Sequence, residues 1–436
     1  MEGLYGPIVR IAPNELSLAS PVAARELLSA GKGFHKTDFY AVFPPPENPD
    51  IFTEIRENVH AQKKRVAGTP YSLNAMQKLT PFIEDTINLL MEKLDKFADS
   101  EGQCDLGSWL HYFAFDVLGE VAFSQKYGFL DQGIDTENAI KTIDNAQWYD
   151  GIVGQIPLVD YFLRRNPLWQ YIPFLSSGNF LITRMALEEM GKRKPYEKTA
   201  GKETDREDLL SQLIKGHLSN PDKFGEGDVF AVAHGAIFAG SDSTASTMQS
   251  FFFHILKDPA VYTRLCQEID QATKDNRLSP TVTWQEAQNL EYFQATLKEA
   301  MRVRPAVGLD ITRYVPPNGA EIQGTKFPGG TRLAVNGWVL HRDTEIFGPD
   351  ADTYRPERWL EDEQKSKTMD RYMFQFGGGS HLCIGRNLAL LEINKVLPTL
   401  LRNYRFKLCH PEKEITYHTT FFVVQSGLDV KIEKSR

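Results

Sequence analysis

The chain has 436 residues, of which 42% are hydrophobic, so it carries enough apolar material for a large buried core. Charged residues make up 24% and aromatic residues 11%, which excludes a disordered, collagen-like or coiled-coil protein. The 57 acidic residues outnumber the 49 Lys and Arg residues, and the net charge of -8 argues against a dedicated nucleic-acid-binding protein.

The start of the chain predicts neither a signal peptide nor a membrane span. It lacks a basic segment followed by an apolar core, and Ile8–Ile11 predicts a strand. The strongest apolar run, Val229 to Gly240, has 12 residues, fewer than the roughly 20 that cross a bilayer. The four cysteines form no CxxC pair, so we expect neither a disulfide framework nor a zinc ribbon. We therefore expect the protein to work in a reducing compartment.

Helical periodicity dominates the chain up to Pro305. Apolar residues at helical spacing follow Pro81, which is favourable in a first helical turn. The segment from Trp109 to Phe123 is almost entirely apolar, which predicts a helix buried on all sides. A proline-free segment from about Glu226 to Lys257 predicts a helix of roughly 45 Å, at about 1.5 Å per residue, that must run through the middle of the molecule.

Short β-rich runs separated by Pro-Gly turns follow Pro305. We therefore expect a mainly α fold with a small β-rich portion, that is, an α+β fold. Because no linker separates the two portions, residues 1–436 are predicted to form a single domain. The predicted strand regions are Ile311–Val315, Ala320–Ile322, Thr331–Val339 and Ile415–Ile432.

The loop over residues 376–386 is the most informative stretch. Three glycines precede Cys383, and a helix is predicted over Asn387–Leu401 directly after it. Glycines let several N–H groups converge on one point, and a helix N-terminus adds positive partial charge there. Both effects favour a thiolate, so we expect a lowered pKa for Cys383 and a role as nucleophile or metal ligand. A buried structural cysteine is the alternative, and the lack of a second ligand pair disfavours zinc.

The spacing of Phe376, Gly379, Cys383 and Gly385 matches F-x-x-G-x-x-x-C-x-G, and it resembles the haem-binding signature of the cytochrome P450 superfamily. The resemblance implies that Cys383 is the axial thiolate ligand of the iron of haem b. It also implies that His381 is a basic partner of a haem propionate and that Phe376 packs beside the thiolate.

Glu299 and Arg302 share one helix face, a spacing that by itself is typical of an exposed ion pair. Residues 354–359, Tyr-Arg-Pro-Glu-Arg-Trp, resemble the meander motif of the same family. The resemblance implies that Glu299, Arg302 and Arg358 form a buried ionic cluster. Removing one member of such a cluster costs roughly 3–5 kcal/mol, because a desolvated charge is left behind.

The long predicted helix carries the motif Ala-Gly-Ser-Asp-Ser-Thr at residues 239–244. Small residues and hydroxyls of this kind are by themselves typical of a close helix crossing. The motif resembles the family's oxygen-activation motif A-G-x-[DE]-T, with Asp242 as the acid and Thr244 next to the alcohol. The resemblance implies that Asp242 and Ser243 relay protons to O2. Ser243 replaces the usual Thr, so it keeps the hydroxyl but lacks the methyl group that restricts its rotamer.

Two further segments resemble family contacts to the haem propionates. Residues His60 to Lys64 resemble [WH]-x-x-x-R with Lys in place of Arg, and lysine lacks the bidentate fork of arginine. Neighbouring Arg65 is the alternative contact, and a solvated basic helix start is the alternative interpretation. Arg313 aligns with another propionate-binding arginine. We interpret His111, and similarly His234 and His254, as ordinary interior or surface residues.

The motifs occur in family order over essentially the whole chain, and their details are most similar to fungal secondary-metabolism members of the pisatin demethylase type. The resemblance implies a haem-thiolate monooxygenase that inserts one oxygen atom of O2 into a lipophilic small molecule, by hydroxylation, demethylation or epoxidation, in secondary metabolism or detoxification. No flavin or NADPH domain is present, so NADPH-cytochrome P450 reductase is the expected electron donor. Lys395, Arg386 and Arg402 are candidates for the basic face that meets it.

Family members of this type are expected at the cytosolic face of the endoplasmic reticulum membrane, which the full-length form contacts through an anchor helix. This chain shows neither anchor nor Pro-rich hinge, and we expect it to be soluble. Alternatives are an isomerase or dehydratase of the same fold, a peroxygenase, and a non-catalytic haem-binding protein. The acid–alcohol pair argues against all three. Substrate contacts are expected from mainly apolar segments, namely Phe39–Phe52, Ile237–Phe238, Ala306–Leu309 and Thr420–Phe422.

Overall fold

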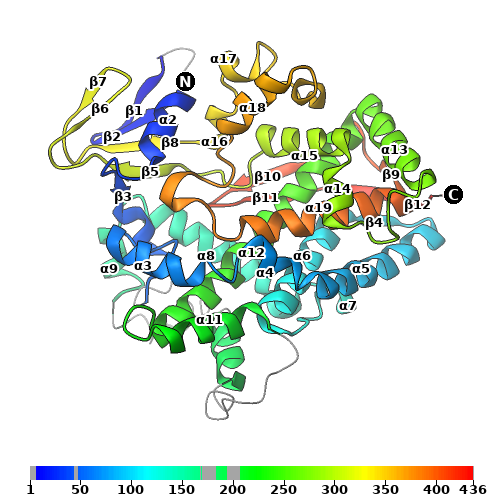
Figure 1. Cartoon of the computed structure of the whole chain (residues 1–436), viewed down its shortest axis with the longest axis horizontal. Coiled ribbons are helices and arrows are strands. Elements are labelled where there is room, and N and C mark those ends of the chain that lie inside the picture. Colours follow the sequence, from blue (N-terminus) through cyan, green and yellow to red (C-terminus); the bar gives the residue numbers. More distant parts are fainter. Residues whose placement is uncertain (1–5, 44–47, 167, 169–182, 194–206, 436) are drawn as a thin grey trace.

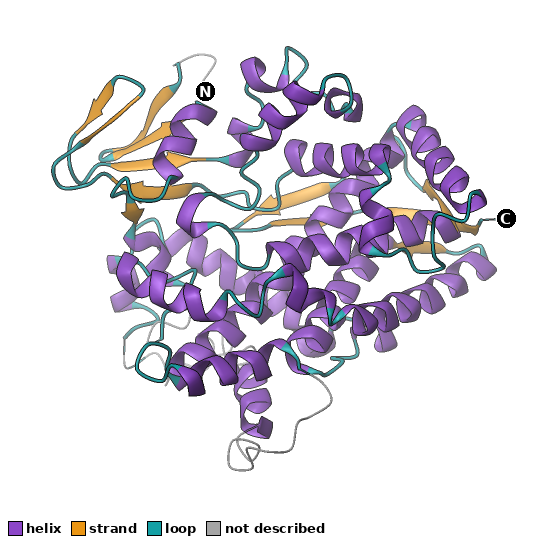
Figure 2. Cartoon of the chain, viewed as in Figure 1, coloured by secondary structure: helices purple, strands orange, loops and turns teal. Residues whose placement is uncertain are grey.

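The computed structural model describes residues 6–43, 48–166, 168, 183–193 and 207–435. In this part of the chain, helices make up most of the structure and short strands gather in small sheets (Figure 2). The predicted mainly α fold with a small β-rich portion is therefore confirmed. No helix among the described residues is both long and apolar enough to cross a bilayer.

The helices of the described residues follow the chain from the first sheet to the C-terminal strands (Figure 1). They are α2 Pro21–Leu28, α3 Glu57–Ala67, α4 Leu73–Gln77, α5 Thr80–Ser100, α6 Leu106–Phe123, α7 Phe129–Gln132, α8 Ala139–Val153, α9 Leu158–Phe162, α11 Leu209–Ser219, α12 Glu226–Lys257, α13 Pro259–Lys274, α14 Trp284–Gln288, α15 Glu291–Val303, α16 Gly337–Leu340, α17 Thr344–Phe347, α18 Glu363–Arg371 and α19 Arg386–Asn403.

The strands of the described residues form one larger sheet and three small ones. The five-stranded sheet has the order β1-β2-β8-β5-β3, and the others pair β4-β12-β9, β10-β11 and β6-β7. The strands are β1 Ile8–Ala12, β2 Glu15–Leu18, β3 His35–Lys36, β4 Gln103–Asp105, β5 Ile311–Tyr314, β6 Ala320–Ile322, β7 Thr325–Phe327, β8 Arg332–Val335, β9 Tyr404–Leu408, β10 Thr416–Thr419, β11 Val423–Ser426 and β12 Asp429–Lys434.

Helix α12 spans the predicted residues and runs through the middle of the molecule (Figure 1). The carboxylate of Asp228 accepts the N–H of Gly225 and so caps its start, and Asp258 ends it and caps α13, which begins with Pro259. It packs along α6, which is buried over most of its length as its apolar sequence predicts. The side chain of Leu118 lies only 3.1 Å from the place of a Cβ at Gly240, so this glycine allows the close crossing.

The predicted strand over Thr331–Val339 is only half right. Strand β8 ends at Val335, and the side chain of Asn336 then accepts the N–H of Trp338 and caps the short helix α16. A capping side chain therefore outweighs the β propensity of the residues that follow. The predicted β region over Ile415–Ile432 is confirmed and divides into β10, β11 and β12.

Candidate active site

Cys383 lies in the glycine-rich loop that precedes α19, and the loop is shaped by its own backbone. The N–H of Cys383 donates to the carbonyl of Phe376 at 2.9 Å, and the N–H of Gly377 donates to the carbonyl of Phe374 at 2.8 Å. Gly379 has a φ of +60°, and a Cβ there would lie 1.8 Å from the carbonyl oxygen of Leu28. Only glycine fits at residue 379, because the chain of α2 approaches the loop so closely.

The prediction of a lowered pKa for Cys383 is wrong. Burial raises the pKa of this thiol, and the N–H groups of Gly385 and Arg386 and the charge of Lys64 oppose the shift without reversing it. The convergent amides are present, as predicted, but the loss of hydration outweighs them. The Cys383 side chain is nevertheless accessible to solvent. The Cys383 thiol, beside the N–H groups of Gly385 and Arg386 and the charge of Lys64, can serve as a metal ligand once it is deprotonated.

Two residues of helix α12 that lie one turn apart are less buried than most of their neighbours. Ala239 is exposed and Ser243, one turn further, is half-buried, although most residues around them on the helix are buried. The hydroxyl of Ser243 donates to the carbonyl of Ala239 at 2.8 Å, and that of Thr244 donates to the carbonyl of Gly240 at 2.9 Å. Both hydroxyls are therefore occupied by their own helix.

The side chain of Asp242 points towards α6 and α8, whereas that of Ser243 turns back to its own helix. The two residues of the predicted acid–alcohol pair are therefore not joined by a hydrogen bond. The carboxylate of Asp242 is buried and accepts Nε2 of His111 on α6 at 2.8 Å and Nε2 of Gln147 on α8 at 2.8 Å. The structure thus gives His111, which we interpreted as an ordinary interior or surface residue, a hydrogen bond to Asp242. No local pattern indicates this contact, since the two residues lie 131 positions apart.

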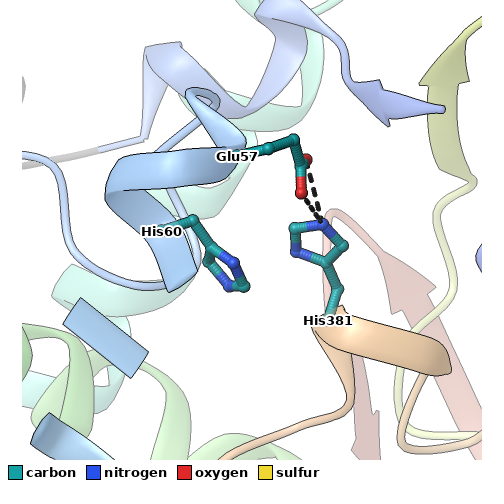
Figure 3. A group of neighbouring side chains, drawn as sticks. All are labelled: Glu57, His60 and His381. Atoms are coloured by element: carbon teal, nitrogen blue, oxygen red, sulfur yellow. Dashed lines mark hydrogen bonds and ion pairs between the residues drawn. The ribbon is translucent and has the colours of Figure 1, made fainter. Parts of the chain in front are cut away.

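A cluster of basic side chains lies beside the cysteine loop. His60 on α3 and His381 face each other with ring centroids 4.2 Å apart (Figure 3). Burial lowers the pKa of His381, and the charges of Lys36 and Arg313 lower it further, whereas the hydrogen bond to Glu57 opposes the shift. We call Lys36, His60, Arg313 and His381 the basic cluster. Lys36 was not found from the sequence, because a single lysine in a two-residue strand carries no recognisable signal.

The basic cluster is buried and poor in negative charge. Burial lowers the pKa of Lys36 to about 7 and that of His60 to about 3, and the positive neighbours add to both shifts. The carboxylate of Glu57 accepts Nε2 of His381 at 3.0 Å, whereas neither Lys36 nor Arg313 has a carboxylate within salt-bridge distance among the described residues.

Two features of the basic cluster fit the carboxylates of a haem. The buried Nδ1 of His381 has no hydrogen-bond partner, and the buried Arg313 lacks a counter-ion, so an anion would satisfy both. Nζ of Lys36 already donates to the carbonyls of Ile51, Phe52 and Glu54, and it adds positive charge nearby. Ligand atoms of Glu57, His60 and His381 lie within 4.8 Å of one another, a donor set that also suits a metal cation. The adjoining charges of Lys36 and Arg313 disfavour a cation and favour an anionic group.

Lys64 and Arg65 differ in where they point. Nζ of Lys64 donates to the carbonyls of Ser380 and Leu382 at 2.7 and 2.6 Å and so ties α3 to the cysteine loop, whereas Arg65 is exposed. Of the two predicted alternatives, the structure therefore brings Lys64 to the site. Its contact to a propionate stays a prediction.

Glu299, Arg302 and Arg358 lie in contact in the buried interior, as predicted. Arg302 donates Nε and Nη2 to the two carboxylate oxygens of Glu299 at 2.9 and 2.8 Å, and Nε of Arg358 donates to the same carboxylate at 2.9 Å. The N–H of Arg355 and the indole of Trp359 complete the set at 2.9 and 2.8 Å. Five donors thus converge on one carboxylate and fix α15 to the 3-10 turn that follows Arg355.

Aromatic rings gather where substrate contacts are predicted. Phe43 contacts Phe39, Phe52 and Phe421 with ring centroids 5.3 to 5.4 Å apart, and Phe52 also contacts Phe421. Residues 44–47 of the predicted loop lie outside the described part of the chain. The rings come from the segment before α3 and from the β10–β11 turn; Phe39 and Phe43 are buried in the core, whereas Phe52 and Phe421 are only partly buried.

The family model described as Cytochrome P450 matches residues 1–432 of this chain. The chain is 36% identical over 434 residues to "Cytochrome P450 monooxygenase cicH" of Emericella nidulans, an alignment that covers 98% of this chain and 86% of that protein. It is 33% identical over 447 residues to "Cytochrome P450 monooxygenase gsfF" of Penicillium aethiopicum, with 98% and 86% covered. It is 35% identical to "Cytochrome P450 monooxygenase mpaDE" of Penicillium roqueforti over 447 residues, which cover all of this chain and 51% of that longer protein.

Proposed function

The chain belongs to the cytochrome P450 family and is a haem-thiolate monooxygenase, and we propose the roles of its residues on that premise. A monooxygenase of this family uses haem iron, O2, a redox partner and a small organic substrate. The alternative of an isomerase or dehydratase is not favoured, because the relatives are monooxygenases. We propose further that residues 1–436 form one catalytic domain, which works in fungal-type secondary metabolism or detoxification.

We assign the cofactor site from one observation, namely that the exposed Cys383 lies beside the basic cluster. The sulfur of Cys383 would bind the iron, with the N–H groups of Gly385 and Arg386 stabilising its negative charge. Arg313, His60 and His381 would bind the propionates of haem b, while Lys64 braces the cysteine loop. When bound, haem supplies the binding and reductive activation of O2, and electron donation from the thiolate favours O–O cleavage.

Helix α12 would serve the reaction with an acid and two hydroxyls. The carboxylate of Asp242 would accept protons and release them to the site, and the hydroxyl of Ser243 lies on a less buried part of the helix, where it can pass a proton on. The small side chain of Ala239, which is exposed, would leave room for O2. The aromatic rings around Phe43 would exclude water and orient a lipophilic substrate for hydroxylation, demethylation or epoxidation.

We propose NADPH-cytochrome P450 reductase as the redox partner and a basic face near α19 as its contact. Arg386 is exposed and stays a candidate for this face. The interpretation of Lys395 as a surface contact is wrong, because Lys395 is fully buried and donates Nζ to Glu84 at 2.7 Å. A membrane location at the endoplasmic reticulum is likewise a proposal from the family.

The test is a CO difference spectrum of the reduced protein. Expression with ample haem precursor should give the red-shifted Soret band of a thiolate-ligated haem, and Cys383→Ala should lose that band. A pyridine haemochrome spectrum would identify haem b. A colourless wild-type protein, or a Cys383→Ala variant with the same band, would contradict the assignment.

A further inference from the structure

The carboxylate of Asp242 is bound by two different kinds of donor. Oδ1 accepts Nε2 of His111 and Oδ2 accepts Nε2 of Gln147, each at 2.8 Å. The amide of Gln147 is fixed at its other end, where Oε1 accepts the N–H of Phe422 at 2.8 Å and the hydroxyl of Thr420 at 3.3 Å. Gln147 therefore holds Asp242 in place but carries no titratable proton, whereas His111 can gain and lose one.

His111 reaches from Asp242 towards solvent. Its side chain is 12% exposed, against 4% for Asp242, and its Nδ1 makes no hydrogen bond to any described residue. It differs in this from His234, whose two ring nitrogens are buried without hydrogen-bond partners, and from His254, whose Nε2 is buried in the same way. The ring of Phe115, on the next turn of α6, packs beside the imidazole at 5.7 Å between ring centroids.

Within the described residues, His111 is the titratable partner of Asp242. The groups bonded to the pair come from α6, α8 and α12, and apart from Gln147 they include only the hydroxyl of Ser241, at 3.4 Å from Oδ1. No other charged side chain of the described chain forms an ion pair with either residue. A proton that reaches Asp242 from water therefore has a direct path through the imidazole.

We propose that His111 is a positioning residue that holds Asp242 through Nε2 and renews its proton from solvent. The proposal rests on the proposed role of Asp242. Monooxygenation joins substrate C–H, O2, two electrons from the redox partner and two protons to give C–OH and one water. For each proton, Nδ1 of the neutral imidazole takes up a proton from hydronium, which leaves water, and the Nε2–H bond of the resulting imidazolium breaks as a bond to Oδ1 of Asp242 forms. The ring is then neutral with its hydrogen on Nδ1, and exchange of that proton with water returns the hydrogen to Nε2 before the next cycle.

The test compares His111→Gln and His111→Phe with the wild-type holoenzyme, using NADPH, the reductase and 7-ethoxycoumarin as the probe. Glutamine keeps an N–H donor for Asp242 but does not titrate, and phenylalanine removes both properties. NADPH consumption and product formation are measured for all three proteins over a range of pH. His111→Gln should be slower by roughly tenfold, with a flat pH profile and an unchanged KM for the probe.

Asp242→Asn and His418→Gln serve as matched comparisons. His418 forms a partly buried pair with Asp144 at the same 2.8 Å, away from Asp242, and its variant should behave as the wild type. If His111→Gln keeps the wild-type rate and pH profile while Asp242→Asn is slow, the proposal for His111 is overturned and the role of Asp242 stands. If Asp242→Asn is also unaffected, the proposed function of Asp242 itself has failed.

A second readout does not depend on turnover. The melting temperatures of His111→Ala, Asp242→Ala and the double variant complete a double-mutant cycle with the wild type. The decreases in melting temperature of the two single variants should not add in the double variant, because either substitution removes the same hydrogen bond. Additive losses would show that the two side chains do not interact in solution, and this result would overturn the proposal even if the activities changed.

Discussion

Replacing Glu299 by alanine should remove the acceptor on which the buried ionic cluster depends. Five donors converge on this carboxylate, and Arg302 and Arg358, which supply three of them, are almost fully buried. Without Glu299 their guanidinium groups keep only backbone carbonyls and Asp350 as partners. Breaking a buried pair in this way costs roughly 3–5 kcal/mol, because one charge stays desolvated and uncompensated.

That cost is a large share of the free energy of unfolding of a typical domain, about 5–15 kcal/mol. We therefore expect Glu299→Ala to give little soluble, haem-loaded protein. Glu299→Gln should lie between this variant and the wild type, since it retains the shape and one good acceptor but loses the charge. Glu363→Ala is the matched control, because Glu363 pairs with Lys367 on an exposed helix face.

The measurements are the yield of holoprotein from the CO difference spectrum and the midpoint of denaturant unfolding. Glu363→Ala should match the wild type in both. A Glu299→Ala protein with wild-type yield and midpoint would refute the reasoning, because it would show that the two arginines find equal stabilisation without their carboxylate.

Three further predictions concern the site and its surroundings. Ser243→Ala should divert electrons to hydrogen peroxide, so that product formed per NADPH falls; an unchanged ratio would discard its role in proton transfer. Lys64→Met should speed haem loss, measured by transfer to apomyoglobin, whereas Arg65→Met should not, and equal rates would contradict the bracing role. Burial lowers the pKa of His254 to about 3, so the unfolded chain binds more protons below about pH 6.5 and stability falls as pH drops from there towards 3. His254→Phe keeps the stacking on Tyr354 and should lose less stability in acid, which thermal melts at several pH values would check.

The sequence by itself determined the features that depend on neighbours along the chain. The bounds of α12 follow from an acidic first turn, the absence of proline, and an Asp-Pro pair at its end. The three glycines, Cys383 and the helix after it are likewise a local pattern, and its family resemblance identified the protein as a haem-thiolate enzyme. The i, i+3 spacing placed Glu299 and Arg302 on one face of α15, and the meander motif supplied Arg358.

Only the tertiary structure decided the features that depend on burial or on contacts between distant segments. The pKa of Cys383 rises because desolvation outweighs the nearby amides, and desolvation is a property of the assembled interior. The contact of His111 with Asp242 joins residues 131 positions apart, and that of Lys64 with Leu382 joins residues 318 apart. Periodicity and spacing report which face of an element is apolar, but not which element packs against it, so no local signal could have revealed these partners.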